Sequence, residues 1–436
     1  MTQEIKQRIE QLRLNKTPDG YKKTSVGVIP QDWEVVRFKK LFSRLTRRNT
    51  EYNKNVLTIS AQYGLISQEE FFNKTVASEN TENYFLLNKG DFAYNKSYSN
   101  GYPFGAIKSL TKYDKGIVSP LYICFSVSEE NKFPEFYNQY FEAGKFNREI
   151  NAYAQEGARN HGLLNIAVED FFNSLLIKPP LAEQQKIAAI LSTQDKVIEL
   201  QQKRIDELKK LKKAYLSKMF PQKGSNVPEL RFKGFTGNWE QRKLGEMGTL
   251  KNGMNFSKDA MDKGFPFVNL QNVFGRNVVD FSMLGKAEAS PNQLKDYNLL
   301  KGDVIFVRSS VKLEGVGEAA LVPETLENTT YSGFIIRFRD EFGLEDDFKR
   351  FVFKTDNVRT QIISQATNSA NKNISQPVLS NLNVSIPKDK TEQQKIGSFF
   401  RKLDDAITLQ SRKLDAEKLK KKSLMQLLLT GIVRVK

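Results

Sequence analysis

Few residues in this chain have the side chains and spacing of a catalytic site. His161 is the single histidine and Cys124 the single cysteine among 436 residues. His161 has no Ser or Cys partner at a recognisable catalytic spacing, and Cys124 stands inside the apolar run 121–127, which is typical of a core strand. One histidine and one cysteine also exclude the usual zinc sites and a disulfide framework.

Glycine-rich and proline-rich segments likewise form no cofactor motif. No G-x-G-x-x-G follows a strand pattern and no G-x-x-x-x-G-K-[ST] occurs, so neither a bound dinucleotide nor a bound triphosphate is predicted. Residues 178–181, Lys-Pro-Pro-Leu, lack the polar head and aromatic tail of the base-holding loop of an amino-methyltransferase. We therefore predict a non-catalytic binding protein, with no catalytic residues, no metal and no cofactor bound by this chain.

Two kinds of segment combine basic, amide and aromatic side chains suited to nucleic acid. One kind follows Asp91 and Asp303, and the other precedes two long helical patterns. Lys and Arg neutralise phosphates, while Arg, Asn and Gln can read base edges. The candidate DNA-binding residues are Lys96, Tyr98, Asn100, Arg159, Asn160, His161, Arg308, Ser309, Lys312, Asn371, Lys372 and Asn373. For any single one of them the alternative is a solvated turn; their grouping at matching places favours binding.

The net charge supports a polyanionic partner. The chain has 67 Lys and Arg against 50 Asp and Glu, a formal charge of +17. This favours nucleic acid first and an anionic membrane surface second. The first residues contain no apolar signal region and no run approaches the length of a membrane span, so we expect a cytoplasmic protein.

The sequence contains an internal repeat. Residues 183–187, Glu-Gln-Gln-Lys-Ile, return at 392–396, and Lys89-Gly90-Asp91 returns as Lys301-Gly302-Asp303. Trp33-Glu34 likewise matches Trp239-Glu240. The repeat period, about 210 residues from 183 to 392, is too long for a solenoid repeat, so a duplicated domain is predicted.

Each copy ends in a long helix with a heptad pattern of apolar residues. The a and d positions are Ile187, Leu191, Gln194, Ile198, Gln201, Ile205, Leu208, Lys212, Tyr215 and Met219 in the first copy, and Ile396, Phe400, Leu403, Ile407, Gln410, Leu414, Glu417, Lys421, Leu424 and Leu428 in the second. A seam of this kind predicts that the helices pair as a coiled coil. The alternative is that each helix caps its own domain, but a helix of ~35 residues is ~50 Å long, more than one domain core covers.

The globular parts show mixed patterns. Apolar runs at 118–127 and 334–338 predict strands, and segments 134–150 and 348–363 predict helices. We therefore expect an α+β fold for each part. The predicted organisation is a short N-terminal helix at 1–20, a globular domain at 21–180, a long helix at 181–220, a linker at 221–230, a second globular domain at 231–390 and a second long helix at 391–430.

The repeat keeps its helices while the candidate contact loops differ. Two copies of one domain that carry different contact loops would recognise two different halves of a DNA sequence. Contacts with phosphates would position each domain, and contacts with bases would determine which sequence it recognises. Helices of ~50 Å, compared with ~34–36 Å per turn of DNA, would place these half-sites one to one and a half turns apart. The expected target is an asymmetric, split DNA sequence.

With these features the chain resembles the specificity subunit of type I restriction–modification enzymes. The resemblance rests on Pro-x-x-x-Glu-Gln-Gln-Lys-Ile at 179–187 and, with one extra residue, at 387–396. It also rests on Gly-Asn-Trp-Glu at 237–240 with its counterpart at 31–34, and on Gly-Ala-Arg at 157–159. The second copy departs from the family pattern, because residues 368–375 lack Gly-Ala-Arg.

The resemblance implies two target-recognition domains separated by two long helices that form an antiparallel coiled coil, with pseudo-twofold symmetry. It implies double-stranded DNA, two modification subunits and restriction subunits as partners. S-adenosylmethionine, ATP and Mg would be on those partners, which would methylate adenine at N6 and cut DNA. The implied partner-binding face comprises Glu183, Gln184, Gln185, Glu392, Gln393 and Gln394. Capping of the first helical turn is the alternative role for these six residues.

Two other classes of function remain open from the sequence. A fused nuclease or methyltransferase would need a cofactor or metal motif that the sequence does not show. A coiled-coil adaptor without specific DNA readout would use its basic charge only for solubility. Affinity for DNA that falls steeply with salt would distinguish a DNA-binding protein from the adaptor.

Overall fold

The computed structural model describes residues 2–60, 64–72, 81–98, 101–128, 133–156, 164–367 and 371–435. These residues form two compact units. The first contains Met1–Leu200 together with Lys413–Lys436, and the second contains Gln201–Arg412. The division follows packing rather than chain order, because the last segment of the chain belongs to the first unit.

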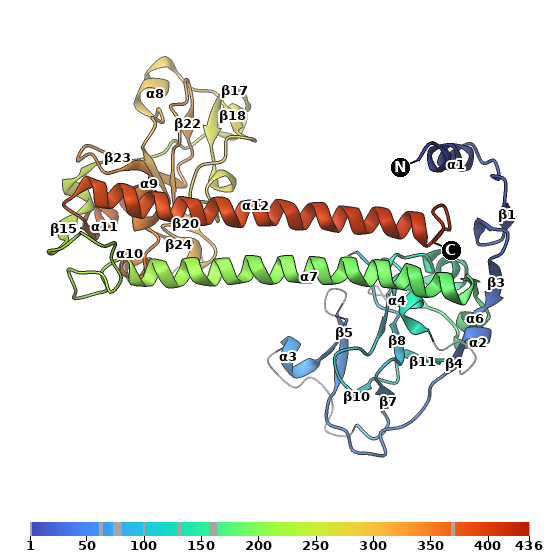
Figure 1. Ribbon diagram of the computed structural model, residues 1–436. Helices are drawn as coiled ribbons and strands as arrows, with labels where there is room; N and C mark the ends of the chain where they lie inside the picture. Colours follow the sequence, from blue (N-terminus) through green and yellow to red (C-terminus); the bar gives the residue numbers. More distant parts are fainter. Residues whose placement is uncertain are drawn as a thin grey trace. The chain divides into compact units, whose positions relative to one another are not determined.

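An antiparallel four-stranded sheet forms the centre of the first unit (Figure 1). Its strand order is β4 (Phe42–Arg44), β11 (Ile123–Val127), β8 (Phe92–Asn95) and β9 (Ala106–Ser109). The helices are α1 (Gln3–Arg13), α2 (Phe38–Leu41), α3 (Gln68–Phe72), α4 (Pro134–Glu142), α5 (Asn147–Tyr153) and α6 (Val168–Asn173). The rings of Phe38, Phe125 and Phe171 contact one another in its core.

Shorter strand pairs complete the first unit. They are β1 (Tyr21–Thr24) with β2 (Gly27–Pro30), β3 (Glu34–Arg37) with β14 (Leu175–Lys178), β5 (Leu57–Ser60) with β6 (Gly64–Ser67), β7 (Phe85–Asn88) with β10 (Lys115–Val118), and β12 (Gln155–Glu156) with β13 (Leu164–Asn165). The β3–β14 pair leads directly into the first long helix, so it fixes where that helix begins.

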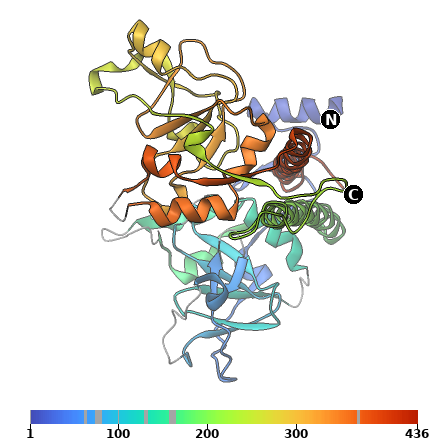
Figure 2. The same cartoon turned by 90° about the vertical axis from the view of Figure 1, so that its left-hand side faces the viewer.

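The second unit repeats this plan. Its four-stranded sheet has the order β16 (Gly248–Asn252), β23 (Ile335–Asp340), β19 (Val304–Val307) and β21 (Ala319–Leu321). Two strand pairs accompany it: β15 (Glu240–Lys243) with β25 (Asn383–Ile386), and β20 (Ser309–Ser310) with β24 (Lys372–Asn373). Its helices α9 (Asp346–Val352), α10 (Asp356–Gln365) and α11 (Gln376–Ser380) are orange in Figure 2. A small sheet of β18 (Gly285–Ala287), β17 (Met261–Val268) and β22 (Thr330–Tyr331) and helix α8 (Pro291–Asp296) are additional.

The predicted duplication and α+β class are confirmed by these equivalent elements. The sheet β4-β11-β8-β9 corresponds to β16-β23-β19-β21, and β3–β14 corresponds to β15–β25. Two helices follow the sheet in each unit, α4 and α5 in the first and α9 and α10 in the second.

Three predicted elements were wrong in detail. The apolar run 118–127 contains the end of β10, a turn and then β11, because Pro120 interrupts it. The predicted helix 134–150 is divided into α4 and α5 at Gly144, whose φ of +66° is incompatible with a continuous helix. The predicted helix 348–363 is likewise divided into α9 and α10.

Two long helices carry the heptad seam. Helix α7 runs from Leu181 to Lys218 and α12 from Lys390 to Leu428. All the predicted a and d positions are buried or partly buried, as a coiled-coil seam requires. In the second unit, Tyr215 near the end of α7 contacts Phe399 near the start of α12, with ring centroids 5.1 Å apart, so the helices are antiparallel there.

The first unit contains the other half of this helix pair. Leu191 near the start of α7 and Leu428 at the end of α12 belong to one buried core cluster. Lys421 of α12 donates to Asp195 of α7, which again places the start of one helix beside the end of the other. The predicted antiparallel pairing is therefore present in both units.

Candidate nucleic-acid interface

In the second unit, the two predicted contact segments lie side by side. Strand β20 pairs with β24, with Ser309 opposite Asn373 and Ser310 opposite Lys372. On the preceding residue, the carbonyl of Arg308 accepts from the Ile374 amide at 2.9 Å. Segments more than 60 positions apart in the sequence are thus joined by backbone hydrogen bonds, as a shared binding site requires.

The side chains of these segments differ in their exposure to solvent. Lys312 and Asn371 are exposed, whereas Arg308, Ser309, Lys372 and Asn373 are partly buried. Arg308 Nη1 donates to the Gly333 carbonyl at 3.3 Å, which holds one edge of its guanidinium near the surface. The arrangement brings cationic and hydrogen-bonding groups to one edge of the unit.

An ion pair with a buried carboxylate fixes strand β19, which ends just before Arg308. Arg339 donates to both carboxylate oxygens of Asp303, at 2.8 and 2.7 Å, and Asp303 is 2% exposed. Asp303 also accepts from the Leu300 amide at 2.8 Å, which closes a turn in which Gly302 has a φ of +87°. The repeated Lys-Gly-Asp motif is therefore a turn that starts strand β19.

The same turn occurs in the first unit. Asp91 accepts from the Asn88 amide at 2.7 Å and from Arg47 Nη2 at 2.9 Å, and Gly90 has a φ of +94°. Burial raises the pKa of Asp91, although these hydrogen bonds act in the opposite direction. The equivalent motif thus positions strand β8 and the residues that follow it.

The residues after β8 also lie beside the pre-helix segment. The Lys96 carbonyl accepts from the Leu164 amide at 3.1 Å, at the start of strand β13. Lys96 is partly buried and Tyr98 is 61% exposed. The other candidates of this unit, Asn100, Arg159, Asn160 and His161, lie outside the described residues.

Lys96 and Arg308 occupy equivalent positions in the two units. Each is the fifth residue after the aspartate of a Lys-Gly-Asp turn, and its carbonyl accepts a hydrogen bond from the segment before a long helix. The segments that follow Asp91 and Asp303 begin as strands, since 92–95 and 304–307 are strands and mostly buried. The contact residues begin where those strands end.

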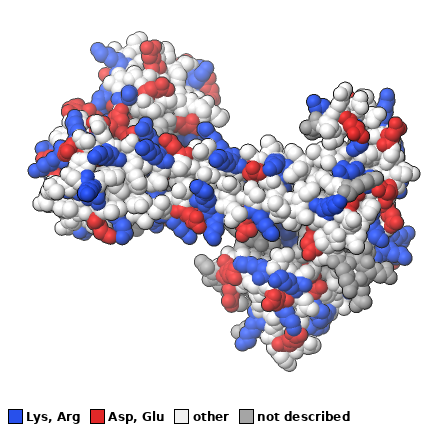
Figure 3. Space-filling view, in the orientation of Figure 1, with Lys and Arg blue, Asp and Glu red and all other residues white. Residues whose placement is uncertain are grey.

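Charge alone does not single out this edge. Lys and Arg side chains are spread over the face shown in Figure 3 and are interspersed with Asp and Glu. The net charge of +17 therefore attracts polyanions to the chain as a whole. Local geometry, rather than the overall field, identifies the paired loops as the candidate site.

The predicted exposed face at the helix starts is wrong for four of its six residues. Glu183, Gln184, Glu392 and Gln393 are each no more than 3% exposed, while Gln185 and Gln394 are exposed. Gln184 donates to the Pro179 carbonyl at 2.7 Å and Gln393 to the Pro387 carbonyl at 3.0 Å. Both glutamines fix the first helical turn to the proline that follows the preceding strand, so they are structural.

The two buried glutamates are held by arginines that the sequence reasoning missed. Arg434 donates to both carboxylate oxygens of Glu183, and Trp33 Nε1 donates to the same carboxylate at 2.8 Å. Arg231 donates to both oxygens of Glu392, each at 2.7 Å. The available signal was a matched arginine after each long helix, in Leu-Arg-Phe at 230–232 and Val-Arg-Val at 433–435.

The heptad lysines also find partners across the helix pair. Lys212 donates to Asp404 in the second unit, and Lys421 donates to Asp195 in the first. The two seam lysines are thus satisfied by equivalent ion pairs, which favours a fixed register.

Within the described ranges, no group of three or more His, Cys, Asp and Glu side chains could hold a metal ion. No helix among the described residues is long and apolar enough to cross a membrane.

Comparison with known proteins gives the family of the chain. The model of the type I restriction modification DNA specificity domain matches residues 30–210 and 236–418. Two relatives from Methanocaldococcus jannaschii are each 24% identical: the type I restriction enzyme MjaVIII specificity subunit covers 94% of both chains, and the putative type I restriction enzyme MjaX specificity subunit covers 96% of this chain and 97% of its own. This chain belongs to the type I restriction–modification DNA specificity family.

Solved structures share the fold. The type I restriction–modification S subunit from M. genitalium aligns with a TM-score of 0.53 and 16% identity, over 91% of this chain and 96% of that one. A chain from a structure on the complex assembly and conformational transition of a type I R-M system aligns with a TM-score of 0.57 and 15% identity, over 93% and 99% of the two chains. The predicted family and fold class are therefore confirmed.

Proposed function

We propose that this chain is the specificity subunit of a type I restriction–modification system and that it recognises an asymmetric, bipartite sequence in double-stranded DNA. The observation that carries the proposal is the paired contact segment present in both units. Each unit presents a cation at the same place, Lys96 or Arg308, next to neighbours that differ between the units. Equivalent frames with different neighbours fit two different half-sites.

The equivalent cations and their neighbours have separate roles. Lysine and arginine share a positive charge but not a planar fork of donors, so their common task is contact with phosphate. The sequence is read by groups that differ, including Tyr98 in the first unit and Ser309, Asn371 and Asn373 in the second. Hydroxyl and amide groups can hydrogen-bond base edges in the major groove.

The chain acts as a scaffold for catalytic partners and has no catalytic residues of its own. Two modification subunits carry S-adenosylmethionine and methylate adenine at N6, and restriction subunits use ATP and Mg for translocation and cleavage. Family membership supports this division of labour. The exposed Gln185 and Gln394 remain candidates for contact with the modification subunits.

The decisive experiment maps methylated adenines in DNA from cells that express this chain with its modification subunits. We expect methylation within one split sequence, with one adenine on each strand. In a second arm, residues 20–180 are replaced by the matching segment of another family member. One half of the recognised sequence then changes and the other half is retained. A change in both halves, or no sequence preference in the parent complex, would contradict the proposal.

A further inference from the structure

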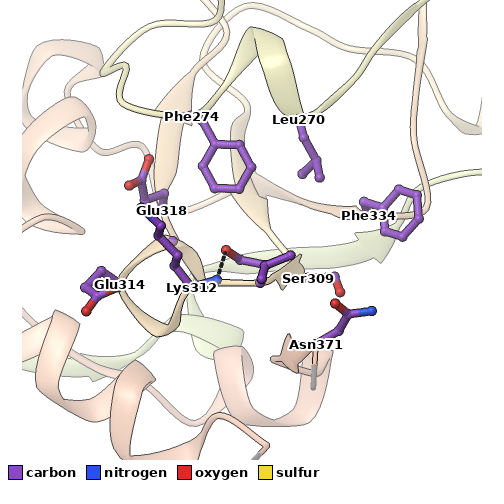
Figure 4. Close-up of a pocket in the computed structure, with 11 residues that line it drawn as sticks. Leu270, Phe274, Ser309, Lys312, Glu314, Glu318, Phe334 and Asn371 are labelled. Atoms are coloured by element: carbon purple, nitrogen blue, oxygen red, sulfur yellow. Dashed lines mark hydrogen bonds between the residues drawn. The ribbon is translucent and has the colours of Figure 1, made fainter. Parts of the chain in front are cut away.

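Beside the paired segments of the second unit is a cavity of about 500 Å³. Its lining includes Leu270, Phe274, Ser309, Lys312, Phe334 and Asn371, so it adjoins three of the candidate DNA contacts. In Figure 4, Phe274, Leu270 and Phe334 lie along the upper side of the cavity, with Leu270 between the two rings and Asn371 below. The cavity thus combines apolar walls with a polar rim.

Its two aromatic rings are unusually accessible. Phe274 is 37% exposed and Phe334 is 56% exposed. Neither ring is stacked on, or set edge-on against, another aromatic ring in the part of the chain that the structure describes. Each uncovered ring, at a site that also has polar groups, can pack against a flat apolar surface.

The wall formed by Phe274 is held in place by specific contacts. The amide of Gly275, the next residue, donates to Glu318 Oε2 at 2.7 Å. Behind the ring, Gly315 approaches so closely that an added Cβ would lie 2.9 Å from Phe274 Cε1 and 2.5 Å from Ser310 Oγ. Glycine is therefore required at this position for the ring to keep its place.

The part of the wall formed by Phe334 is tied to the candidate phosphate contact. The Arg308 amide donates to the Phe334 carbonyl at 2.8 Å, and the Phe334 amide donates to Ser332 Oγ at 3.3 Å. The backbones of Phe334 and Arg308 are thus hydrogen-bonded to each other, so the ring and the cation lie close together. DNA that contacts Arg308 would pass next to this ring.

The charges around the cavity exclude a phosphate as its occupant. Glu314 and Glu318 line it together with Lys312, so an anion would meet two carboxylates and one ammonium group. Ser309 and Asn371 instead offer hydroxyl and amide groups suited to the hydrogen-bonding edge of an uncharged ring. The ligand that fits is a flat, neutral ring with polar groups at its edge, such as a nucleobase.

We propose that this cavity receives one nucleobase that leaves the stack of the half-site read by the second unit, and that the base contacts Phe274 and Phe334 there. The inference rests on the proposed function and adds a discriminating contact to it. Aromatic walls suit bases outside a stack, since stacking on a ring compensates for part of the lost base stacking. The base is a specificity determinant and is distinct from the adenine that the modification subunits methylate.

The test uses the complex of this chain with its modification subunits and synthetic duplexes of the mapped target. Purines of the second half-site are replaced one at a time by 2-aminopurine, and thymines are probed with permanganate. We expect one position other than the methylated adenine to become fluorescent or reactive on binding. Phe334→Ala and Phe274→Ala should abolish this signal and weaken binding about tenfold.

Phe342→Ala is the matched control, because Phe342 is also an exposed ring of the second unit, at 40%, and does not line the cavity. This variant should keep both the signal and the affinity. Gly315→Ala tests the same wall without removing a ring and should reduce the signal. Two results would overturn the cavity proposal while sequence-specific binding is retained. In one, the unstacked base persists in both Phe→Ala variants. In the other, no base besides the methylated adenine is unstacked in the parent complex. Failure of the parent complex to prefer its mapped target would instead overturn the proposed function as well.

Discussion

Arg434 binds the carboxylate of Glu183 through two hydrogen bonds, Nε to Oε1 at 2.8 Å and Nη2 to Oε2 at 2.7 Å. The two residues are 251 positions apart, and Glu183 is in the first turn of α7. In the second unit, Arg231 makes the equivalent contact with Glu392 at the start of α12. The segment after each long helix therefore fixes the beginning of the other helix.

Replacing Arg434 by alanine should strongly destabilise the first unit. The side chains of Arg434 and Glu183 are 18% and 3% exposed, so the variant leaves a buried carboxylate without its main partner. Removal of one member of a buried pair costs about 3–5 kcal/mol. The chain has two tryptophans, Trp33 in the first unit and Trp239 in the second. In a Trp239→Phe background, urea unfolding followed by Trp33 fluorescence measures this loss for the first unit alone.

Arg231→Ala is the matched control for that experiment. Measured through Trp239 in a Trp33→Phe background, it should destabilise the second unit by a similar amount. Measured through Trp33, the same substitution should leave the first unit unchanged. Equal effects of Arg434→Ala on both units would show that the arginine does not act through Glu183.

The Glu183 contact should also make the first unit sensitive to acid. Burial acts to raise the pKa of Glu183, but hydrogen bonds from Arg434 and Trp33 outweigh burial, and the pKa lies below its usual value. The stabilisation is therefore complete above the unfolded-state pKa of about 4.3 and disappears as the pH falls through the folded-state pKa. The difference in unfolding free energy between the parent chain and Glu183→Gln should shrink as the pH is lowered from 6 to about 3. A constant difference over this range would contradict the assignment.

The arginine contacts show where sequence reasoning reached its limit. The repeat at 183–187 and 392–396 and the heptad spacing predict duplicated domains and paired helices, because both signals are local in the sequence. Glutamate in the first turn of a helix is usually exposed, so the sequence gives no sign that Glu183 and Glu392 are buried. They are buried because they pack against residues more than 150 positions away. The matched arginine after each long helix was the one available signal for their partners, and the pairing itself became evident only from the structure.

Site prediction had a similar limit. The residues after the two Lys-Gly-Asp turns were found because charge and amide groups cluster there, and the structure does join them to the segments before the long helices. Phe274 and Phe334 were missed, since an apolar residue in a strand-rich segment normally indicates core. Their exposure depends on how segments that are distant in the sequence pack around the cavity, so it has no local signature.

The ion pairs across the helix seam should differ in strength. Lys212 and Asp404 have side-chain exposures of 17% and 19%, whereas Asp195, the partner of Lys421, is 42% exposed. Water screens the more exposed pair, and exposed pairs contribute about 0.2–1 kcal/mol. Double-mutant cycles with Lys→Met and Asp→Asn should give a coupling of about 1–2 kcal/mol for Lys212–Asp404 and less for Lys421–Asp195.

Each cycle is followed by urea unfolding through the tryptophan of its own unit. Lys420→Met is a suitable control, because Lys420 is 59% exposed on α12 and pairs within its own helix with Glu417. It should change stability by less than about 0.5 kcal/mol. A larger coupling at Lys421–Asp195 than at Lys212–Asp404 would contradict the screening argument.

Arg308→Ala and Lys96→Ala should weaken DNA binding in the same way. If each cation contacts phosphate, its removal lowers affinity for target and unrelated duplexes alike, and reduces the slope of log K against log salt by about 0.9. Arg308→Lys should restore the slope, because phosphate contact requires charge rather than a planar fork. Lys295→Ala, an exposed lysine on α8, is the control and should leave the slope unchanged. Loss of discrimination at a single base pair with an unchanged slope would instead identify Arg308 as a base-reading residue, and the equivalence of Lys96 and Arg308 would then be limited to their place in the fold.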